Sequence, residues 1–146
     1  MNIGIDVHGV IDADYELWAK LTKDWREQGH KIHIVTGQER KLIEPELIEN
    51  KIQFDEFFSI VDSEVKKGTH TWTRSDKKGR WMDRDIWMRA KGDYAAMVNL
   101  DVHFDDTAAY GENFPMTCVF ICCRGMSYNI MNLQDLGWGG PFHPTH

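Results

Sequence analysis

The sequence predicts an α/β fold, namely a three-layer sandwich around a mostly parallel, Rossmann-like sheet. Short apolar segments with the length and composition of buried strands lie at 2–6, 31–36, 57–61, 101–105 and 117–122. Segments with helical spacing of apolar residues lie between them, near 14–28, 39–50 and 86–98. Strands that alternate with helices favour a parallel sheet covered by helices on both faces.

The composition fits one globular domain over residues 1–146. The chain is 42% hydrophobic, and no apolar run approaches the ~20 residues of a membrane span. The formal net charge of -6 argues against nucleic acid as the main partner, but it leaves room for a nucleotide or another small phosphate ester held by local cations. Three cysteines, without a secretion signal at the start, predict reduced thiols and a cytoplasmic protein.

Two of the predicted strands end in residues suited to phosphate chemistry. Asp6 stands at the carboxyl end of the first strand, where open α/β sheets keep their active sites. Thr36 and Gly37 end the second strand, where a hydroxyl and free backbone N–H groups can bind an anion. Each residue also has a structural interpretation, because Asp commonly closes turns and Thr commonly caps helices.

A third strand ends in two adjacent carboxylates, Asp105 and Asp106. Neighbouring acids repel one another unless a cation or a basic side chain lies between them. The pair therefore predicts a cation or a basic side chain at this end of the sheet.

These motifs, in this order, resemble those of the haloacid dehalogenase (HAD) superfamily over roughly residues 2 to 124. The resemblance implies a magnesium-dependent phosphohydrolase in which Asp6 forms an aspartyl-phosphate. It assigns the metal to Asp6, the His8 carbonyl, Asp105 and Asp106, and the phosphoryl group to Thr36, Gly37 and Lys91. Lys66 and Lys67 are alternatives for the lysine. The first motif, from Gly9 to Tyr15, is similar to that of the deoxyribonucleotidase branch.

His8 departs from the family pattern, in which a second aspartate at this position acts as general acid and base. Histidine can do this work, since it is the commonest general acid–base in enzymes. The alternative is a catalytically weak or inactive HAD-like protein that binds phosphate and metal.

Only one helix fits between Asp6 and the second strand, so no large cap domain is expected. A neighbouring subunit could then complete the site, and an oligomer is therefore compatible with the sequence. Residues 64–85 are expected to be irregular, with a two-stranded hairpin or lid insertion within 66–85. This basic segment either forms a lid that faces the phosphate or is an exposed, solvated loop. The residues to test are Trp72, Arg74, Arg80 and Trp81.

The Gly- and Pro-rich tail, 125–146, is expected to lack regular structure. Buried thiols are expected at Cys118, Cys122 and Cys123.

Overall fold

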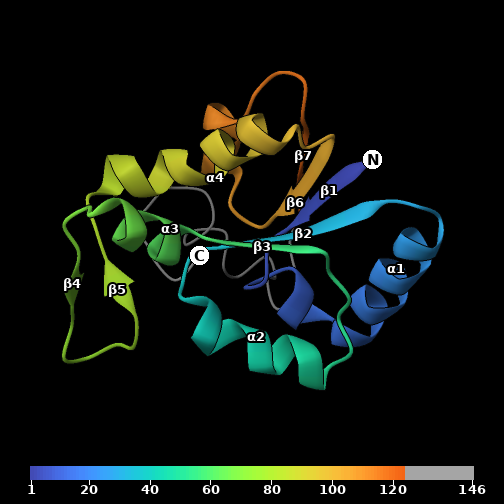
Figure 1. Cartoon of the computed structure of the whole chain (residues 1–146), viewed down its shortest axis with the longest axis horizontal. Helices are drawn as coiled ribbons and strands as arrows, with labels where there is room; N and C mark the ends of the chain where they lie inside the picture. Colours follow the sequence, from blue (N-terminus) through green and yellow to red (C-terminus); the bar gives the residue numbers. More distant parts are fainter. Residues whose placement is uncertain (124–146) are drawn as a thin grey trace, which may run out of the picture.

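The computed structural model describes residues 1–123 and contains a parallel five-stranded sheet (Figure 1). The strand order is β3-β2-β1-β6-β7, and all four ladders between neighbours are parallel. The prediction of an α/β fold with a mostly parallel sheet is confirmed. The strands are β1 (Asn2–Ile5), β2 (Lys31–Thr36), β3 (Glu56–Ser59), β6 (Val102–Asp105) and β7 (Val119–Cys122).

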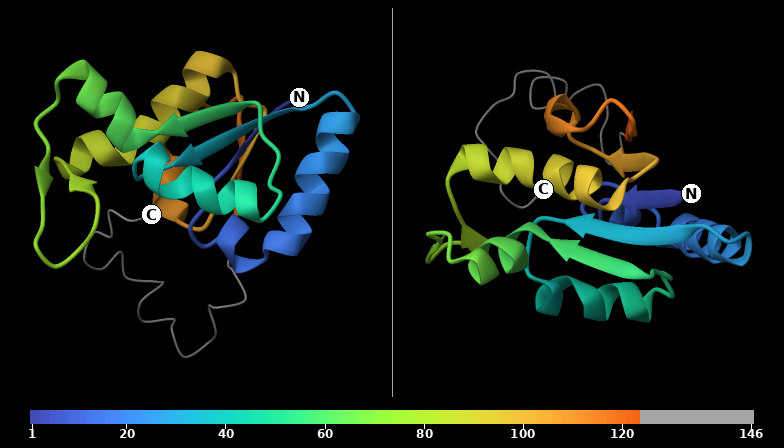
Figure 2. Two further views of the ribbon diagram at one scale, coloured as in Figure 1. Left: turned by 60° about the horizontal axis from the view of Figure 1, so that its bottom comes forward. Right: turned by 45° about the horizontal axis from the view of Figure 1, so that its top comes forward.

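Helices cover both faces of this sheet, and Figure 2 shows α2 and α4 on opposite sides of it. The helices α1 (Tyr15–Glu27) and α2 (Arg40–Glu49) pack on one face, and α3 (Ile60–Lys67) and α4 (Arg84–Val98) pack on the other. Side chains of β2 alternate accordingly. Ile32 and Ile34 join the α1 and α2 cluster, while Val35 packs with Tyr94 and Ala95 of α4.

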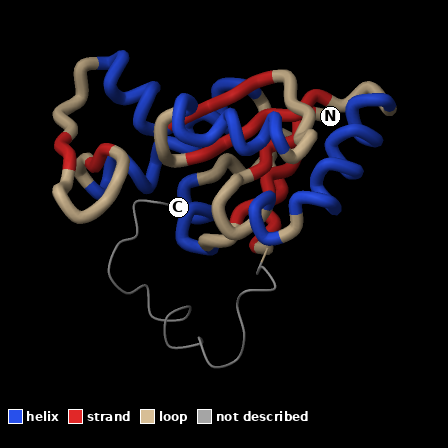
Figure 3. Tube along the Cα trace, turned by 90° about the horizontal axis from the view of Figure 1, so that it is seen from below, coloured by secondary structure: helices blue, strands red, loops and turns tan. Residues whose placement is uncertain are grey.

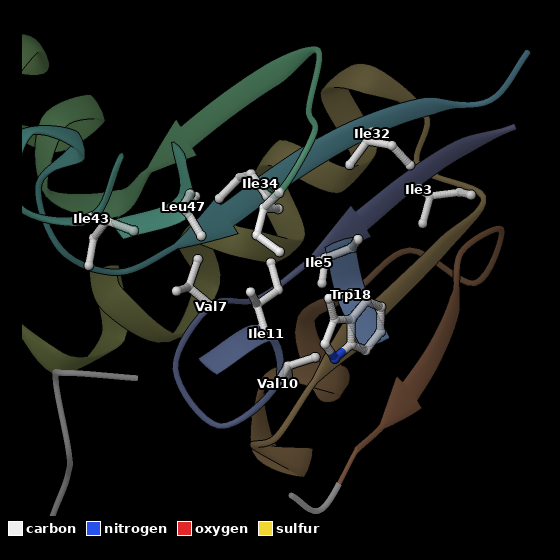
Figure 4. Packing of buried hydrophobic residues seen from close by; sticks show 11 residues of the cluster. Ile3, Ile5, Val7, Val10, Ile11, Trp18, Ile32, Ile34, Ile43 and Leu47 are labelled. Atoms are coloured by element: carbon white, nitrogen blue, oxygen red, sulfur yellow. The ribbon is translucent and has the colours of Figure 1, made fainter. Parts of the chain in front are cut away.

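The larger hydrophobic cluster lies between the sheet and the first two helices (Figure 4). Ile3 and Ile5 of β1 meet Trp18 of α1, and the Trp18 ring also packs edge-on against Phe104, with ring centroids 5.4 Å apart. Because each fully buried side chain of this size contributes about 1.5–3 kcal/mol, this cluster holds the strands in register. It thereby fixes the positions of the strand ends.

The prediction that 64–85 is irregular outside its hairpin is wrong at both ends of the segment, because α3 (Ile60–Lys67) covers 64–67 and α4 begins at Arg84. Ser59 caps the N-terminus of α3 by accepting the Asp62 N–H at 3.0 Å, and Gly68 ends this helix in the left-handed conformation, with φ +82°. The apolar residues Ile60 and Val61 continue the apolar pattern of β3 without a break. The strand predicted at 57–61 therefore ran past the end of β3 at Ser59 and into the first turn of α3.

The predicted hairpin is present, as the antiparallel pair β4 (Trp72–Thr73) and β5 (Arg80–Trp81). Figure 3 shows its two short strands at one end of the molecule, apart from the main sheet. Two 3₁₀ helices, η1 (Ile11–Ala13) and η2 (Ala108–Asn113), complete the described elements.

The expectation of three buried thiols is wrong. Cys118 is buried, but Cys122 is exposed and Cys123 is half-buried. The reason is that β7 is the last strand in the sheet order, so its outer edge pairs with no described strand. The predicted irregular tail, 125–146, lies outside the described residues. Among residues 1–123, no helix has the length and apolar character needed to cross a membrane.

Candidate active site

Three predicted site residues lie together at the carboxyl ends of neighbouring strands. Asp6 follows β1, Thr36 ends β2 and Asp105 ends β6, and β1 lies between the other two strands. The Asp6 N–H donates to the Phe104 carbonyl at 2.9 Å, which continues the β1–β6 ladder up to the site. All three side chains are fully buried. Such a convergence at the point where the strand order reverses is where open α/β sheets bind ligands.

Lys91 of α4 bridges two of these strand ends from one face of the sheet. Its Nζ donates to Asp6 Oδ1 at 3.1 Å and to Asp105 Oδ2 at 2.8 Å, and it lies 4.6 Å from the centre of the Tyr110 ring. The two alternative lysines lie elsewhere: Lys66 is exposed near the end of α3, and Lys67 pairs with Glu64 at 3.0 Å. The geometry therefore selects Lys91 as the lysine of the site.

Burial and the neighbouring charges shift the pKa values of Asp6 and Lys91. Burial raises the pKa of Asp6 well above its usual range, Asp105 raises it further, and Lys91 only partly offsets both effects. Burial alone would lower the pKa of Lys91, but Asp105 and Asp6 outweigh it and raise that pKa. One lysine thus balances two carboxylates incompletely, so a further cation would be favoured beside them.

Asp105 is held by groups on three sides. Besides Lys91, its Oδ2 contacts His103 Nε2 at 2.9 Å, and its Oδ1 accepts the Thr107 N–H at 3.2 Å. His103 was not predicted as a site residue. It lies two residues before Asp105 on the same strand and therefore on the same face of the sheet. Gly4 on the paired strand makes room for it, since a Cβ at Gly4 would lie 2.7 Å from His103 Nδ1.

Asp106 completes a group of three carboxylates with Asp6 and Asp105. One ligand oxygen from each lies within 4.8 Å of the others, and all three residues are buried. Gly9, at φ +82°, lies directly against the Asp106 carboxylate, and any Cβ there would collide with it. The loop after β1 is thereby folded onto the acidic pair.

The donor set fits a hard divalent cation. Asp6 Oδ2 is buried and has no hydrogen-bond partner within the described part of the chain, although Oδ1 of the same carboxylate is bonded to Lys91. Three carboxylates that bring one oxygen each this close together match the all-oxygen coordination that Mg²⁺ prefers. Cysteine and histidine ligands, which favour zinc, are not part of this group.

The predicted phosphate-binding residues lie on the loop between β2 and α2. Thr36 Oγ1 is buried and unpartnered among the described residues, so a hydroxyl is available to an anion at the end of β2. The next residue, Gly37, is buried, and its carbonyl accepts the Val61 N–H at 3.0 Å. This bond fixes the loop to the start of α3.

Gln38, which was not predicted, joins this loop to the hairpin. Its Nε2 donates to the Arg80 carbonyl at 3.2 Å, and its Oε1 accepts the Arg80 N–H at 3.1 Å. Gly79 packs so closely on the amide that a Cβ there would collide with it. The only sequence signal for Gln38 is its position directly after Thr36 and Gly37.

The two hairpin arginines named from the sequence, Arg74 and Arg80, differ in their charged partners. Arg74 is neutralised by Asp76 through contacts of 2.9 and 2.6 Å, and its guanidinium lies 5.9 Å from the centre of the Trp81 ring. Arg80 donates from Nη1 to Thr71 Oγ1 at 3.3 Å. The backbone of Arg80 lies beside the loop between β2 and α2, because Gln38 of that loop holds both its N–H and its carbonyl.

His8 lies on the loop after β1, and one third of its side chain is exposed. Its Nδ1 lies 3.2 Å from Asp12 Oδ2, within the turn that leads into η1.

No family model, curated protein or solved structure matches this chain.

Proposed function

We propose that this protein is a magnesium-dependent phosphohydrolase that acts on a small phosphate ester through an aspartyl-phosphate on Asp6. The observation that carries the proposal is the Asp6 side chain, whose Oδ1 is held by Lys91 while its buried Oδ2 remains without a partner among residues 1–123. A carboxylate held through one oxygen and unpartnered at the other keeps a lone pair for nucleophilic attack.

The neighbouring residues supply the other requirements of phosphoryl transfer. Mg²⁺, held by Asp6, Asp105, Asp106 and the His8 carbonyl, would offset the charge of the phosphoryl oxygens. The Thr36 hydroxyl, the Gly37 backbone and the Lys91 ammonium group would bind and orient those oxygens. Attack by an anion on an anion needs this neutralisation, and most of the barrier is lowered by positioning and charge.

The reaction would then take two steps. In the first, Asp6 Oδ2 attacks phosphorus, the P–O bond to the ester oxygen breaks, and His8 gives a proton to the departing alkoxide. In the second, His8 takes a proton from water, the resulting hydroxide attacks phosphorus, and the bond to Asp6 breaks. Inorganic phosphate leaves, and both side chains return to their starting states.

The test is a screen of phosphate esters, nucleoside monophosphates included, with Mg²⁺ and with a chelator. Wild type should release phosphate only with Mg²⁺, and Asp6→Asn should lose turnover, because an amide is a poor nucleophile of nearly the same shape. More than a few percent residual activity in Asp6→Asn would remove Asp6 from the nucleophile role.

The second candidate is a HAD-like protein that binds phosphate and metal without turnover, and the substitution of the family's second aspartate by His8 favours it. Calorimetric binding of Mg²⁺ and inorganic phosphate, with no ester hydrolysed in the screen, would support this candidate. Hydrolysis of any ester that depends on Asp6 would exclude it.

A further inference from the structure

His8 and Asp12 form an imidazole–carboxylate pair on the loop that follows β1. His8 Nδ1 lies 3.2 Å from Asp12 Oδ2, and about one third of each side chain is exposed. No described residue hydrogen-bonds to Nε2, the other ring nitrogen. The pair begins two residues after Asp6, the proposed nucleophile.

Asp12 is itself fixed by its surroundings. Its second oxygen, Oδ1, accepts the Gly9 N–H at 2.7 Å, and its own N–H donates to the Val7 carbonyl at 3.1 Å. The two pairs of α1 at the same spacing are longer: Lys20 and Asp24 lie 3.6 Å apart, and Lys23 and Glu27 lie 3.8 Å apart. Both carboxylate oxygens of Asp12 thus contact the loop that carries His8, one at the Gly9 N–H and one at the His8 ring.

The chemistry of the two side chains determines which nitrogen of the His8 ring carries the proton. A carboxylate can only accept, so it selects the tautomer whose proton is on Nδ1. The lone pair is then on Nε2, at the edge of the ring opposite Asp12. In serine hydrolases an aspartate that accepts from Nδ1–H fixes the tautomer and orientation of the general base in the same way.

We propose that Asp12 is the positioning residue for His8, which it holds as the Nδ1–H tautomer with Nε2 available for proton transfer. The catalytic part of this inference rests on the proposed phosphohydrolase function, whereas the tautomer does not. Where the HAD motif has a single aspartate as general acid and base, this chain would use the His8 imidazole, oriented by the Asp12 carboxylate.

The first test measures the tautomer in the full-length, ¹⁵N-labelled protein without metal, at a pH about two units above the ordinary imidazole value of ~6.5. Nitrogen shifts distinguish the two tautomers, and the spectrum of His8→Gln identifies the His8 signals. Wild type should show Nδ1–H at His8. Asp12→Asn should shift the ring to Nε2–H, because the amide can donate to Nδ1.

The matched control is Asp14→Asn, because Asp14 lies on the same loop and caps α1 by accepting the Leu17 N–H at 3.1 Å. Asparagine caps helices as well as aspartate does, so this variant should leave the His8 tautomer unchanged. Nε2–H in wild type, or Nδ1–H that persists in Asp12→Asn, would overturn the proposal.

The second test uses two kinds of ester once hydrolysis is detected. Asp12→Asn should lower kcat/KM, which reports the steps up to departure of the leaving group, by on the order of 10²-fold for an alkyl phosphate, the lower end of what a general acid contributes. It should have little effect on kcat/KM for p-nitrophenyl phosphate, whose leaving group departs without a proton. Equal losses on both esters would assign Asp12 to loop structure and overturn its positioning role. If wild type hydrolyses no ester, the proposed function fails, and the tautomer still decides whether Asp12 orients His8.

Discussion

Lys91 Nζ lies 3.1 Å from Asp6 Oδ1, although 85 residues separate the two in the sequence. The same ammonium group donates to Asp105 Oδ2 at 2.8 Å, so one cation from α4 ties together the ends of two adjacent strands. All three side chains are fully buried. Such a cluster is costly to desolvate and gives little net stability, and its presence at the strand ends is better explained by function.

Removal of Lys91 should destabilise the protein strongly. In Lys91→Met two buried carboxylates lose their common partner, and breaking a buried pair from one side costs about 3–5 kcal/mol. The double variant Lys91→Met/Asp6→Asn should recover part of this loss, because one unpaired charge is gone. Urea unfolding at neutral pH measures both effects.

The matched control is Lys67→Met, which breaks the pair with Glu64 on α3, where 65% of the lysine side chain is exposed. This change should cost no more than about 1 kcal/mol. Equal losses in Lys67→Met and Lys91→Met would show that Lys91 does not compensate the buried acids.

Magnesium should stabilise the folded chain by mass action. A ligand at about 100 times its Kd adds about 2.7 kcal/mol, which raises the Tm by roughly 5–10 °C in a domain of this size. Asp106→Asn should abolish the response and keep the fold, because the amide oxygen can still accept the Thr107 hydroxyl that donates to Asp106 at 3.0 Å.

Differential scanning fluorimetry with and without Mg²⁺ is the measurement. Glu112→Gln on η2 removes an exposed carboxylate outside the acidic group and should retain the full shift. A wild-type Tm that stays constant in saturating Mg²⁺ would argue against a metal site at Asp6, Asp105 and Asp106.

Much of the fold and the core of the candidate site follow from local sequence patterns. Apolar strands that end in Asp6, Thr36 and Asp105 predict a parallel sheet with polar strand ends, and parallel strands bring those ends to one edge. The structure places these three residues and Lys91 together as expected. The catalytic roles given to them stay predictions.

The residues that were missed depend on contacts between distant segments. His103 has the sequence context of any strand residue, and its place beside Asp105 depends on Gly4 in the paired strand. Gln38 gains its role from Arg80, which lies 42 residues later. No local pattern reports such contacts, because they depend on the packing of whole elements.

The hairpin should behave as a fixed wall of the site rather than a mobile lid. Gly79→Ala places a Cβ against the Gln38 amide and should break the two hydrogen bonds to Arg80. The hairpin would then open more often, and trypsin should cut faster after Lys77 and Lys78. Gln38→Ala should have the same effect.

Gly29→Ala is the control for backbone strain. Gly29 also has positive φ, +90° against +105° at Gly79, but its Cβ would meet nothing within 4 Å. The control should therefore carry only the cost of a non-glycine residue at positive φ, with no faster cleavage of the hairpin. Equal cleavage rates in wild type and Gly79→Ala would show that Gln38 does not hold the hairpin.

Asp55 should make stability depend on pH at the opposite end of the sheet. Its Oδ2 accepts the Ile32 N–H at 2.8 Å, and its Oδ1 accepts from Arg26 at 3.1 and 2.9 Å. Burial would raise the pKa of Asp55, but these hydrogen bonds and the Arg26 charge outweigh burial and lower it. Because the folded pKa lies below the unfolded value of ~3.9, the contribution is complete above that value. It is lost as pH falls through the folded pKa.

Asp55→Asn should therefore lower the free energy of unfolding by about 1–2 kcal/mol at pH 7, and the difference from wild type should shrink toward pH ~3. Urea titrations across this range measure it. Asp24→Asn, which breaks only the loose surface pair with Lys20 at 3.6 Å, should cost less than about 0.5 kcal/mol at pH 7. A loss in Asp55→Asn that is the same at both ends of the range would mean that shape, and not the ionised carboxylate, joins α1 to the loop before β3.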